Sequence, residues 1–238
     1  MQSARNMLRS YLMPRPLVET AEVRARLESL HHPGYPFCPP WQGDFLYRLC
    51  RTQQCTSALE VGFATGSTAL YLLAGTEPCG GSVVSIDFRQ SDFERLGCRM
   101  VETSPWEKRH CLIEENSNVA LPRMYAEGKK WGLIFLDGWK TVDHLMLDMY
   151  YSARMLDVGG VLVFDDTRMK SVKRVNRLLL SHYAFNEVDY KKMGEDFKMW
   201  LWFRATTRSL VRPYRAFRKV MDQAEWPACK SYQFYSRF

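Results

Sequence analysis

A glycine-rich turn is the first feature of this sequence that could do chemistry. The residues EVGFATG at 60–66 end an apolar segment and lead into a helix-like segment. Gly62 and Gly66 allow the backbone to turn sharply and to approach a ligand closely, and the start of a helix leaves N–H groups free. The turn is therefore either a binding loop for a nucleotide-like ligand or an ordinary tight turn. Because Ala64 and Ser67 stand where the dinucleotide pattern G-x-G-x-x-G has its second and third glycines, NAD binding is disfavoured.

A carboxylate ends the next apolar segment. Asp87 closes the run GSVVSID, 27 residues after Glu60. An acid at this place can accept hydrogen bonds from both hydroxyls of a ribose, or it can cap the helix that follows. The acid before the glycine turn, the glycines four residues apart and the acid that ends the next segment together favour ligand binding more than any one of them does.

Acids also end two later apolar segments. Asp137 ends WGLIFLD with Lys140 three residues behind it, and the pair Asp165 and Asp166 ends GGVLVFDD. On their own, the paired acids could be a helix cap or a solvated turn, and Asp137 with Lys140 could be a local ion pair.

The elements that must position these side chains alternate between strand-like and helix-like. Short apolar runs without polar alternation, each followed by a helix, indicate a parallel sheet covered on both faces. The predicted fold class is therefore α/β, a doubly wound, mostly parallel sheet, in which ligands bind beyond the carboxyl ends of the strands. The predicted strands are 57–61, 81–87, 110–116, 131–137 and 159–166, and the predicted helices are 20–30, 43–50, 67–75, 93–102 and 142–156.

The two ends of the chain differ from this middle. Prolines between the first helix and the sheet predict that residues 1–41 form an N-terminal arm or lid-like segment, and that residues 42–238 form the main domain. Two strand-like runs around a turn at 193–196 predict a C-terminal antiparallel hairpin. After them, arginines at helical spacing predict one basic helical face that restarts near Pro213; they are Arg204, Arg208, Arg212, Arg215 and Arg218.

The motifs together resemble a known family. An acidic residue, one intervening residue and a glycine-rich loop, as at 60–66, are similar to the first motif of class I S-adenosylmethionine (SAM) methyltransferases. IFLDGWKTVDH, with VLVFDD downstream and WQGDFLYRLC ahead of the first strand, resembles the catechol and caffeoyl-CoA O-methyltransferase group. The similarity covers residues 42–167. It implies a Rossmann-like methyltransferase domain at 42–238 and an enzyme that transfers a methyl group from SAM to an oxygen.

The resemblance implies which residues bind the cofactor. Glu60 and the loop from Gly62 to Ser67 would hold the methionine end of SAM, and Asp87 would bind the ribose hydroxyls. Ser117 and Asn118 would lie near the adenine. The implied cofactor-binding set is Glu60, Gly62, Phe63, Ala64, Gly66, Ser67, Asp87, Phe88, Ser117, Asn118, Asp137 and Trp139.

The resemblance also implies a divalent metal held by Asp137, Asp165 and Asp166, with Lys140 as general base and Asp137 beside it as catalytic residues. The catechol group usually has Asn where Asp166 stands, so the ligand set departs from the family pattern. Oxygen-only ligands favour Mg, Mn or Ca over Zn, and Mg is expected. Such an ion would chelate vicinal oxygens of a catechol-like or polyhydroxylated small molecule and lower the pKa of a hydroxyl.

Charge and composition leave two further functions open. The net charge is +7, and the residues from 167 onward contain 16 basic and 6 acidic side chains. This asymmetry suits a solvated face, contacts in a homodimer, or an anionic partner. That partner could be a membrane surface, an acidic small molecule, or a phosphate-bearing substrate such as a coenzyme A thioester or tRNA, so an RNA methyltransferase is the first alternative. A catalytically inert SAM-fold binding subunit is the second. Seven cysteines without a C-x-x-C pair favour reduced thiols in the cytoplasm, and no apolar run is long enough for a membrane span.

Overall fold

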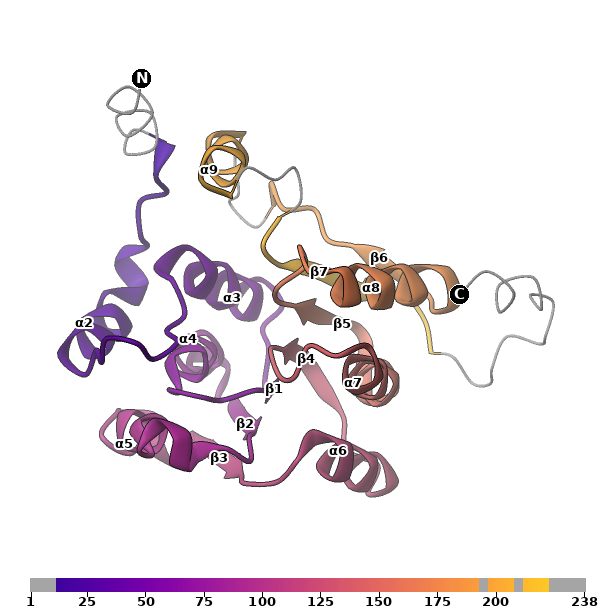
Figure 1. Cartoon of the computed structure of the whole chain (residues 1–238), viewed down its shortest axis with the longest axis horizontal. Helices are drawn as coiled ribbons and strands as arrows, with labels where there is room; N and C mark the ends of the chain where they lie inside the picture. Colours follow the sequence, from indigo (N-terminus) through magenta and orange to yellow (C-terminus); the bar gives the residue numbers. More distant parts are fainter. Residues whose placement is uncertain (1–11, 193–196, 208–211, 223–238) are drawn as a thin grey trace.

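A single seven-stranded sheet organises the chain. The computed structural model describes residues 12–192, 197–207 and 212–222. In this part the strand order is β3-β2-β1-β4-β5-β7-β6, with β1 to β5 parallel and β7 antiparallel to both β5 and β6 (Figure 1). The strands are β1 (Ser57–Val61), β2 (Ser82–Ile86), β3 (His110–Ile113), β4 (Trp131–Leu136), β5 (Leu156–Phe164), β6 (Phe185–Glu187) and β7 (Arg215–Lys219). The predicted fold class is confirmed.

Helices cover both faces of the sheet (Figure 1). Buried side chains of α2, α3, α4 and α5 form one hydrophobic cluster with the sheet, and those of α6, α7 and α8 form a second. The helices are α2 (Ala21–Ser29), α3 (Pro40–Thr52), α4 (Ser67–Thr76), α5 (Leu96–Glu102), α6 (Ser117–Ala126), α7 (Val142–Met155), α8 (Lys170–His182) and α9 (Phe197–Thr207). Short 3-10 helices are η1 (Val18–Thr20), η2 (Glu77–Cys79), η3 (Gln90–Phe93) and η4 (Glu107–Arg109).

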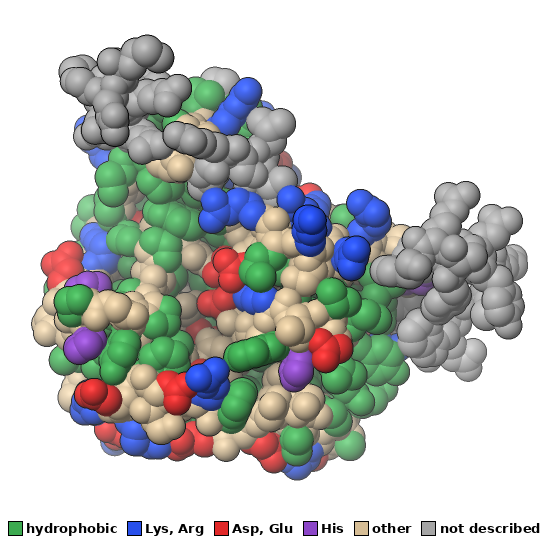
Figure 2. All heavy atoms as spheres, viewed as in Figure 1, with side chains coloured by type: hydrophobic (Ala, Val, Ile, Leu, Met, Phe, Trp, Pro, Cys, Tyr) green, Lys and Arg blue, Asp and Glu red, His purple; other side chains and the backbone are tan. Residues whose placement is uncertain are grey.

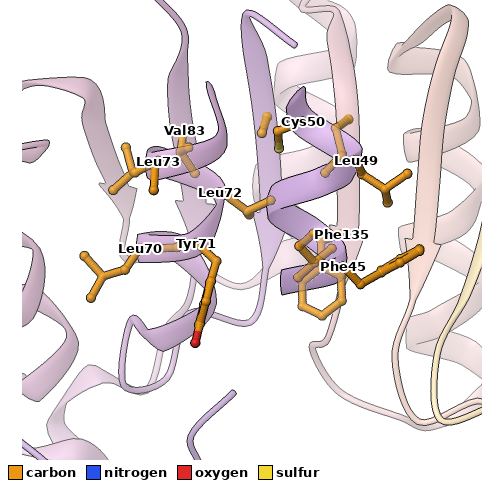
Figure 3. Packing of buried hydrophobic residues seen from close by; sticks show 14 of the residues in the cluster. Phe45, Leu49, Cys50, Leu70, Tyr71, Leu72, Leu73, Val83 and Phe135 are labelled. Carbon is orange, nitrogen blue, oxygen red and sulfur yellow. The ribbon is translucent and has the colours of Figure 1, made fainter. Parts of the chain in front are cut away.

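The central strands are apolar on both sides because each side packs on a helical layer. In β4, Leu133 and Phe135 belong to the first cluster, whereas Ile134 and Leu136 belong to the second, and all four are fully buried. Figure 3 shows the first cluster, in which residues of α3 and α4 meet Phe135 of the sheet. Side chains of successive strand residues point to opposite faces, so a strand covered on both faces lacks polar alternation. This is the pattern from which the parallel sheet was predicted.

The C-terminal antiparallel pairing is confirmed, but its second strand is not the predicted segment. The run after residue 196 forms α9, because Met199 and Phe203, four residues apart, are both buried against the first cluster. The strand that pairs with β6 is β7, in which the buried Ala216 and Phe217 lie between the partly exposed Arg215 and Arg218. The predicted turn at 193–196 lies outside the described residues.

The predicted arginine-lined helical face is wrong for the same reason. Arg215 and Arg218 lie in β7, while Arg204 lies in α9, and Arg208 is outside the described residues. The aromatic residues between these arginines, Tyr214 and Phe217, are both 0% exposed. Since a buried ring cannot stack on a base, this feature no longer supports the RNA alternative.

Two expectations from composition can be followed in the described residues. All six cysteines there are free thiols, as expected; Cys229 lies outside them. None of the helices described here is long and apolar enough to cross a membrane.

Candidate active site

The glycine loop after β1 adopts the tight conformation that its sequence predicts. Gly62 has a φ of +96°, and a Cβ added to it would lie 2.5 Å from the carbonyl oxygen of Asp137. Gly66, the residue before α4, has a φ of +70°. Both backbone conformations favour glycine. Gly62 therefore allows the loop to lie directly against the segment that follows β4.

Asp87 holds this loop in place. Its Oδ2 accepts hydrogen bonds from the backbone N–H groups of Phe63 and Ala64, at 3.0 and 2.7 Å. Its Oδ1 accepts one from the N–H of Arg89, at 2.7 Å. The side chain of Phe63 is buried and stacks on the ring of His110, with centroids 5.0 Å apart. The backbone of Phe63 is therefore part of the loop, while its ring packs in the hydrophobic core.

Glu60 lies beneath the loop and is fully buried. Its Oε2 accepts a hydrogen bond from the Ser85 hydroxyl at 2.7 Å, whereas its Oε1 has no partner in the described part of the chain. Burial raises the pKa of this carboxyl well above its usual range. A buried acceptor without a partner is costly, and a donor group of a ligand would relieve that cost.

The acids that end β4 and β5 come together beside the loop. Asp137, Asp165 and Asp166 each offer an oxygen, and these oxygens lie within 4.8 Å of one another. The two strands are parallel neighbours, so their carboxyl ends meet at one edge of the sheet. Lys140 donates a hydrogen bond from Nζ to Asp137 Oδ1 at 2.8 Å, and the same Nζ lies 3.9 Å from Asp166 Oδ2. Figure 2 shows acidic side chains gathered on this face of the molecule.

The charges in this acidic cluster are out of balance, because one ammonium group faces three carboxylates. Burial raises the pKa of Asp137 to about 7; Lys140 lowers it, and the two neighbouring acids raise it further. Burial also raises the pKa of Asp165, while a hydrogen bond with Gln42 lowers it. A cation bound here would relieve the repulsion among the carboxylates.

Two residues that the sequence reading misses support the cluster from other elements. Gln42 of α3 is 5% exposed and meets Asp165, and no local pattern marks it, because it lies in an amphipathic helix. Asp148 of α7 is 1% exposed and lies beneath Gly138, where an added Cβ would be 3.7 Å from its Oδ2. Burial raises the pKa of Asp148 to about 6. From the sequence alone, an acid in a helix is expected on the exposed side, and only the packing shows that Asp148 is buried.

The remaining predicted residues lie around the same edge. Phe88 and Trp139 are 54% and 52% exposed and directly follow the segments that end in Asp87 and Gly138. Ser117 and Asn118 begin α6, which follows β3, and the Asn116 side chain accepts a hydrogen bond from the Asn118 N–H at 3.2 Å. All of them lie in segments that follow parallel strands of the sheet.

The N-terminal arm closes onto the loop from the opposite direction. The Thr65 hydroxyl donates a hydrogen bond to the carbonyl of Pro36 at 2.6 Å, and the Cys38 N–H donates one to the Ser67 hydroxyl at 2.8 Å. Residues of the arm therefore contact both sides of the turn into α4. Whether the arm acts as a lid remains a prediction.

Comparisons with known proteins agree with this geometry. The model of a methyltransferase domain family matches residues 59–167. A search of the curated proteins found no match.

Several solved structures share the fold. An O-methyltransferase from Bacillus cereus in complex with SAH is 18% identical, with a TM-score of 0.61, covering 78% of this chain and 89% of that one. A candidate caffeoyl-CoA O-methyltransferase from Staphylococcus aureus is 15% identical, with a TM-score of 0.61 and coverage of 83% and 91%. An SAH-bound methyltransferase from Podospora anserina is 12% identical, with a TM-score of 0.68 and coverage of 93% and 97%.

At these identities the solved structures establish the fold alone, and the family model matches residues 59–167, which are less than half of the chain. The matched segment begins in β1 and ends just after Asp166, so it contains the glycine loop and all three acids of the cluster. The match to a methyltransferase domain family and the fold shared with solved O-methyltransferases agree with the predicted resemblance to class I SAM-dependent O-methyltransferases.

Proposed function

We propose that this protein is a SAM-dependent O-methyltransferase that uses a divalent metal to methylate a hydroxyl group of a small molecule with vicinal oxygens. The observation that carries the proposal is the juxtaposition of the glycine loop with the acidic cluster. The loop touches the backbone of Asp137 at Gly62, and Asp137 also belongs to the cluster. A methyl donor held at the loop and an oxygen held at the cluster would be neighbours, as in-line transfer requires.

The residues at the loop fit SAM. Glu60 Oε1 is buried without a hydrogen-bond partner in the described residues, which suits the amino group of the methionine end. Gly62 lets the loop lie directly against the backbone of Asp137, which places the loop beside the acidic cluster. Asp87 is partly exposed at the end of β2, where a carboxylate can bind ribose hydroxyls. When bound, SAM supplies the electrophilic methyl group, and the protein supplies position and charge.

The acidic cluster fits a hard divalent cation. Asp137, Asp165 and Asp166 provide only oxygen donors, which suit Mg or Mn better than Zn. The raised pKa values of Asp137 and Asp165 record the cost of holding these acids close together and buried. A bound cation supplies Lewis acidity, which lowers the pKa of a coordinated hydroxyl. Vicinal oxygens match this cluster because two of them can chelate one ion.

Lys140 is the chain's own group for moving a proton at this site. Its Nζ is held at 2.8 Å from Asp137 and 3.9 Å from Asp166, and its side chain is only 12% exposed. In its neutral form the amine can accept the proton of an acceptor hydroxyl, and Asp137 orients it for that role.

The proposal is tested with the full chain in two steps. SAM binding is measured first by calorimetry, and a dissociation constant in the micromolar range is expected. Transfer of labelled methyl from SAM to 3,4-dihydroxybenzoate, and to its monohydroxy analogue as control, is then followed with Mg and after exhaustive chelation. Activity with the diol that needs the metal supports the proposal. SAM binding without transfer to any member of a diol panel would favour an inert binding subunit instead.

A further inference from the structure

A basic surface lies beside the acidic cluster, and the proposed chemistry does not account for it. It is formed by the exposed side of α8, the helix that follows Asp165 and Asp166. Figure 2 shows Lys and Arg side chains gathered close to the acidic side chains on this face. Residues 168–186 contain no Asp or Glu, so no acid of α8 neutralises its Lys and Arg side chains.

The cations of α8 share one face of the helix. Lys170, Lys173, Arg174 and Arg177 are spaced by three, one and three residues, which places them along one side. All four are exposed, while Val172, Val175 and Leu179 point into the second hydrophobic cluster. Their side chains make no hydrogen bond or ion pair with the described part of the chain. This face therefore holds positive charge that the described residues do not pair.

Two of these cations, Lys173 and Arg177, line a cavity. It has a volume of about 450 Å³ and is lined by residues of α8 and β7 and by the loop between β5 and α8: Thr167, Lys173, Arg177, Leu180, Ser181 and Arg215. Glu187 accepts two hydrogen bonds from the guanidinium of Arg215, which neutralises that arginine. Among the described residues of the cavity wall, Lys173 and Arg177 remain as cations without an acidic partner.

The wall of the cavity includes a residue that is a chain neighbour of the acidic cluster. Thr167, in its wall, directly follows Asp166 in the chain. Arg215 pairs with Phe164, the last residue of β5, so this wall also reaches the carboxyl edge of the sheet. One extended molecule could therefore reach both places, with oxygens at the acidic cluster and an anionic group in the cavity.

We propose that the methyl acceptor carries a phosphate group, and that Lys173 and Arg177 bind this group in the cavity while its vicinal hydroxyls occupy the acidic cluster. This inference rests on the proposed function and narrows its substrate class to phosphorylated polyhydroxy compounds. A phosphate carries a compact double charge and several acceptor oxygens, which two unpaired donors bind well. The acids at the cluster would repel a phosphate placed there, so the two charged regions fix the direction in which the acceptor binds.

The test measures anion binding without methyl transfer. The full chain is titrated with inorganic pyrophosphate by calorimetry, alongside a Lys173→Gln/Arg177→Gln double variant. Because hydrogen bonds to charged groups are worth about 1.5–3 kcal/mol each, the double variant should bind at least about tenfold more weakly. The matched control is Lys108→Gln/Lys129→Gln, which removes the same charge from exposed positions outside the cavity and should bind as the wild type does.

The outcomes separate this inference from the proposed function. SAM affinity should be unchanged in both double variants, since neither touches the glycine loop. Pyrophosphate binding that is equally weak in wild type and variants, or equally reduced in the control, would overturn the cavity assignment while leaving the SAM result intact. In a second arm, ribose 5-phosphate should compete with pyrophosphate and ribose should not. Binding to single-stranded RNA whose salt slope exceeds that of two contacts, at about −0.7 each, would identify nucleic acid as the source of the phosphate.

Discussion

Two neighbouring parts of this edge of the sheet differ in how their carboxylates are paired: the loop side, which is the glycine loop at 62–66 with Asp87, and the acid side, which is the acidic cluster with Lys140. On the loop side, Asp87 accepts three backbone hydrogen bonds, and it ties the turn to β2. On the acid side, Asp137, Asp165 and Asp166 lie within reach of one another and share the ammonium of Lys140. The loop backbone is thus fixed by hydrogen bonds without a ligand, although the buried Oε1 of Glu60 beneath it has no partner in the described residues. The acid side stores repulsion that a ligand would relieve.

This difference suggests a division of labour. A site that is already hydrogen-bonded does not need to reorganise when its ligand arrives, so its binding energy is not spent on ordering. A site with excess negative charge instead selects for cations and changes its protonation state when one binds. The two sides meet where the backbone of Gly62 lies against the backbone of Asp137.

The largest effect is expected where the two sides touch. Gly62→Ala would place a Cβ 2.5 Å from the carbonyl oxygen of Asp137, at a φ of +96°. Strain and overpacking together should cost about 3 kcal/mol of stability, and methyl transfer should fall at least about 100-fold. Urea unfolding and labelled-SAM transfer measure the two effects.

Gly80→Ala is the control for backbone strain alone. Gly80 also has a positive φ, +68°, but a Cβ there would meet nothing within 4 Å. Its cost should be about 1 kcal/mol, with activity unchanged. Equal losses in the two variants would contradict the contact argument.

Removing the base should affect only the acid side. Lys140→Met is expected to lower turnover by about 10²- to 10⁴-fold, the range for loss of a general base, while SAM affinity changes less than about twofold. Lys140→Arg keeps the charge near Asp137 but cannot accept a proton, so it should not restore turnover. Turnover near the wild-type value in either variant would exclude Lys140 as the base. Lys129→Met, at an exposed position of the chain, serves as control.

The loop side was more predictable from the sequence than the acid side's surroundings. Gly62 and Gly66 are needed for local reasons, because a turn with positive φ selects glycine wherever it occurs. The apolar runs of β1, β4 and β5 likewise predict buried parallel strands, and parallel neighbours bring their terminal acids together. Local sequence patterns and the topology of a parallel sheet were sufficient to predict the glycine loop and the meeting of the strand-ending acids.

Features that depend on distant packing were missed or misplaced. Gln42 and Asp148 reach the site from helices, and nothing in their neighbourhood marks them as buried polar residues. The basic helix α8 was not predicted at all, and β7 was predicted as a helix. In β7, Arg215 and Arg218 are three residues apart with buried residues between them, a spacing that also fits a helix in so short a run. Only the pairing with β5 and β6 decides between strand and helix.

Removing one charge from the acidic cluster should have a moderate effect on the metal requirement. Asp166 has a φ of +52°, a conformation that Asn also tolerates, so Asp166→Asn changes charge with little change of backbone. The Mg concentration for half-maximal activity should rise about threefold to tenfold, while SAM affinity stays constant. Asp92→Asn, in η3 and paired with Arg89, removes a charge elsewhere and should leave the Mg requirement unchanged. An unaltered Mg requirement in Asp166→Asn would remove this residue from the ligand set.

The smallest effect should appear in the pH dependence of stability on the acid side. The pKa of Asp148 is raised from 3.8 to about 6, so the folded protein binds a proton there that the unfolded chain releases. Its contribution is present below about pH 4 and is lost as the pH rises through about 6. Asp148→Asn removes this loss, so its stability relative to wild type should increase by about 2 kcal/mol between pH 4 and pH 8.

Urea unfolding at both pH values, with chelator present, measures this difference. Comparing variant with wild type at each pH cancels the similar contributions of Asp137 and Asp165, whose pKa values are raised in the same direction. Asp143→Asn, whose carboxyl lies on the exposed side of α7 and has a lowered pKa, should show no such gain. If Asp148→Asn followed the wild-type curve in parallel, the carboxylate would be ionised in the folded protein throughout this range. Burial of Asp148 would then carry no cost in its ionised form.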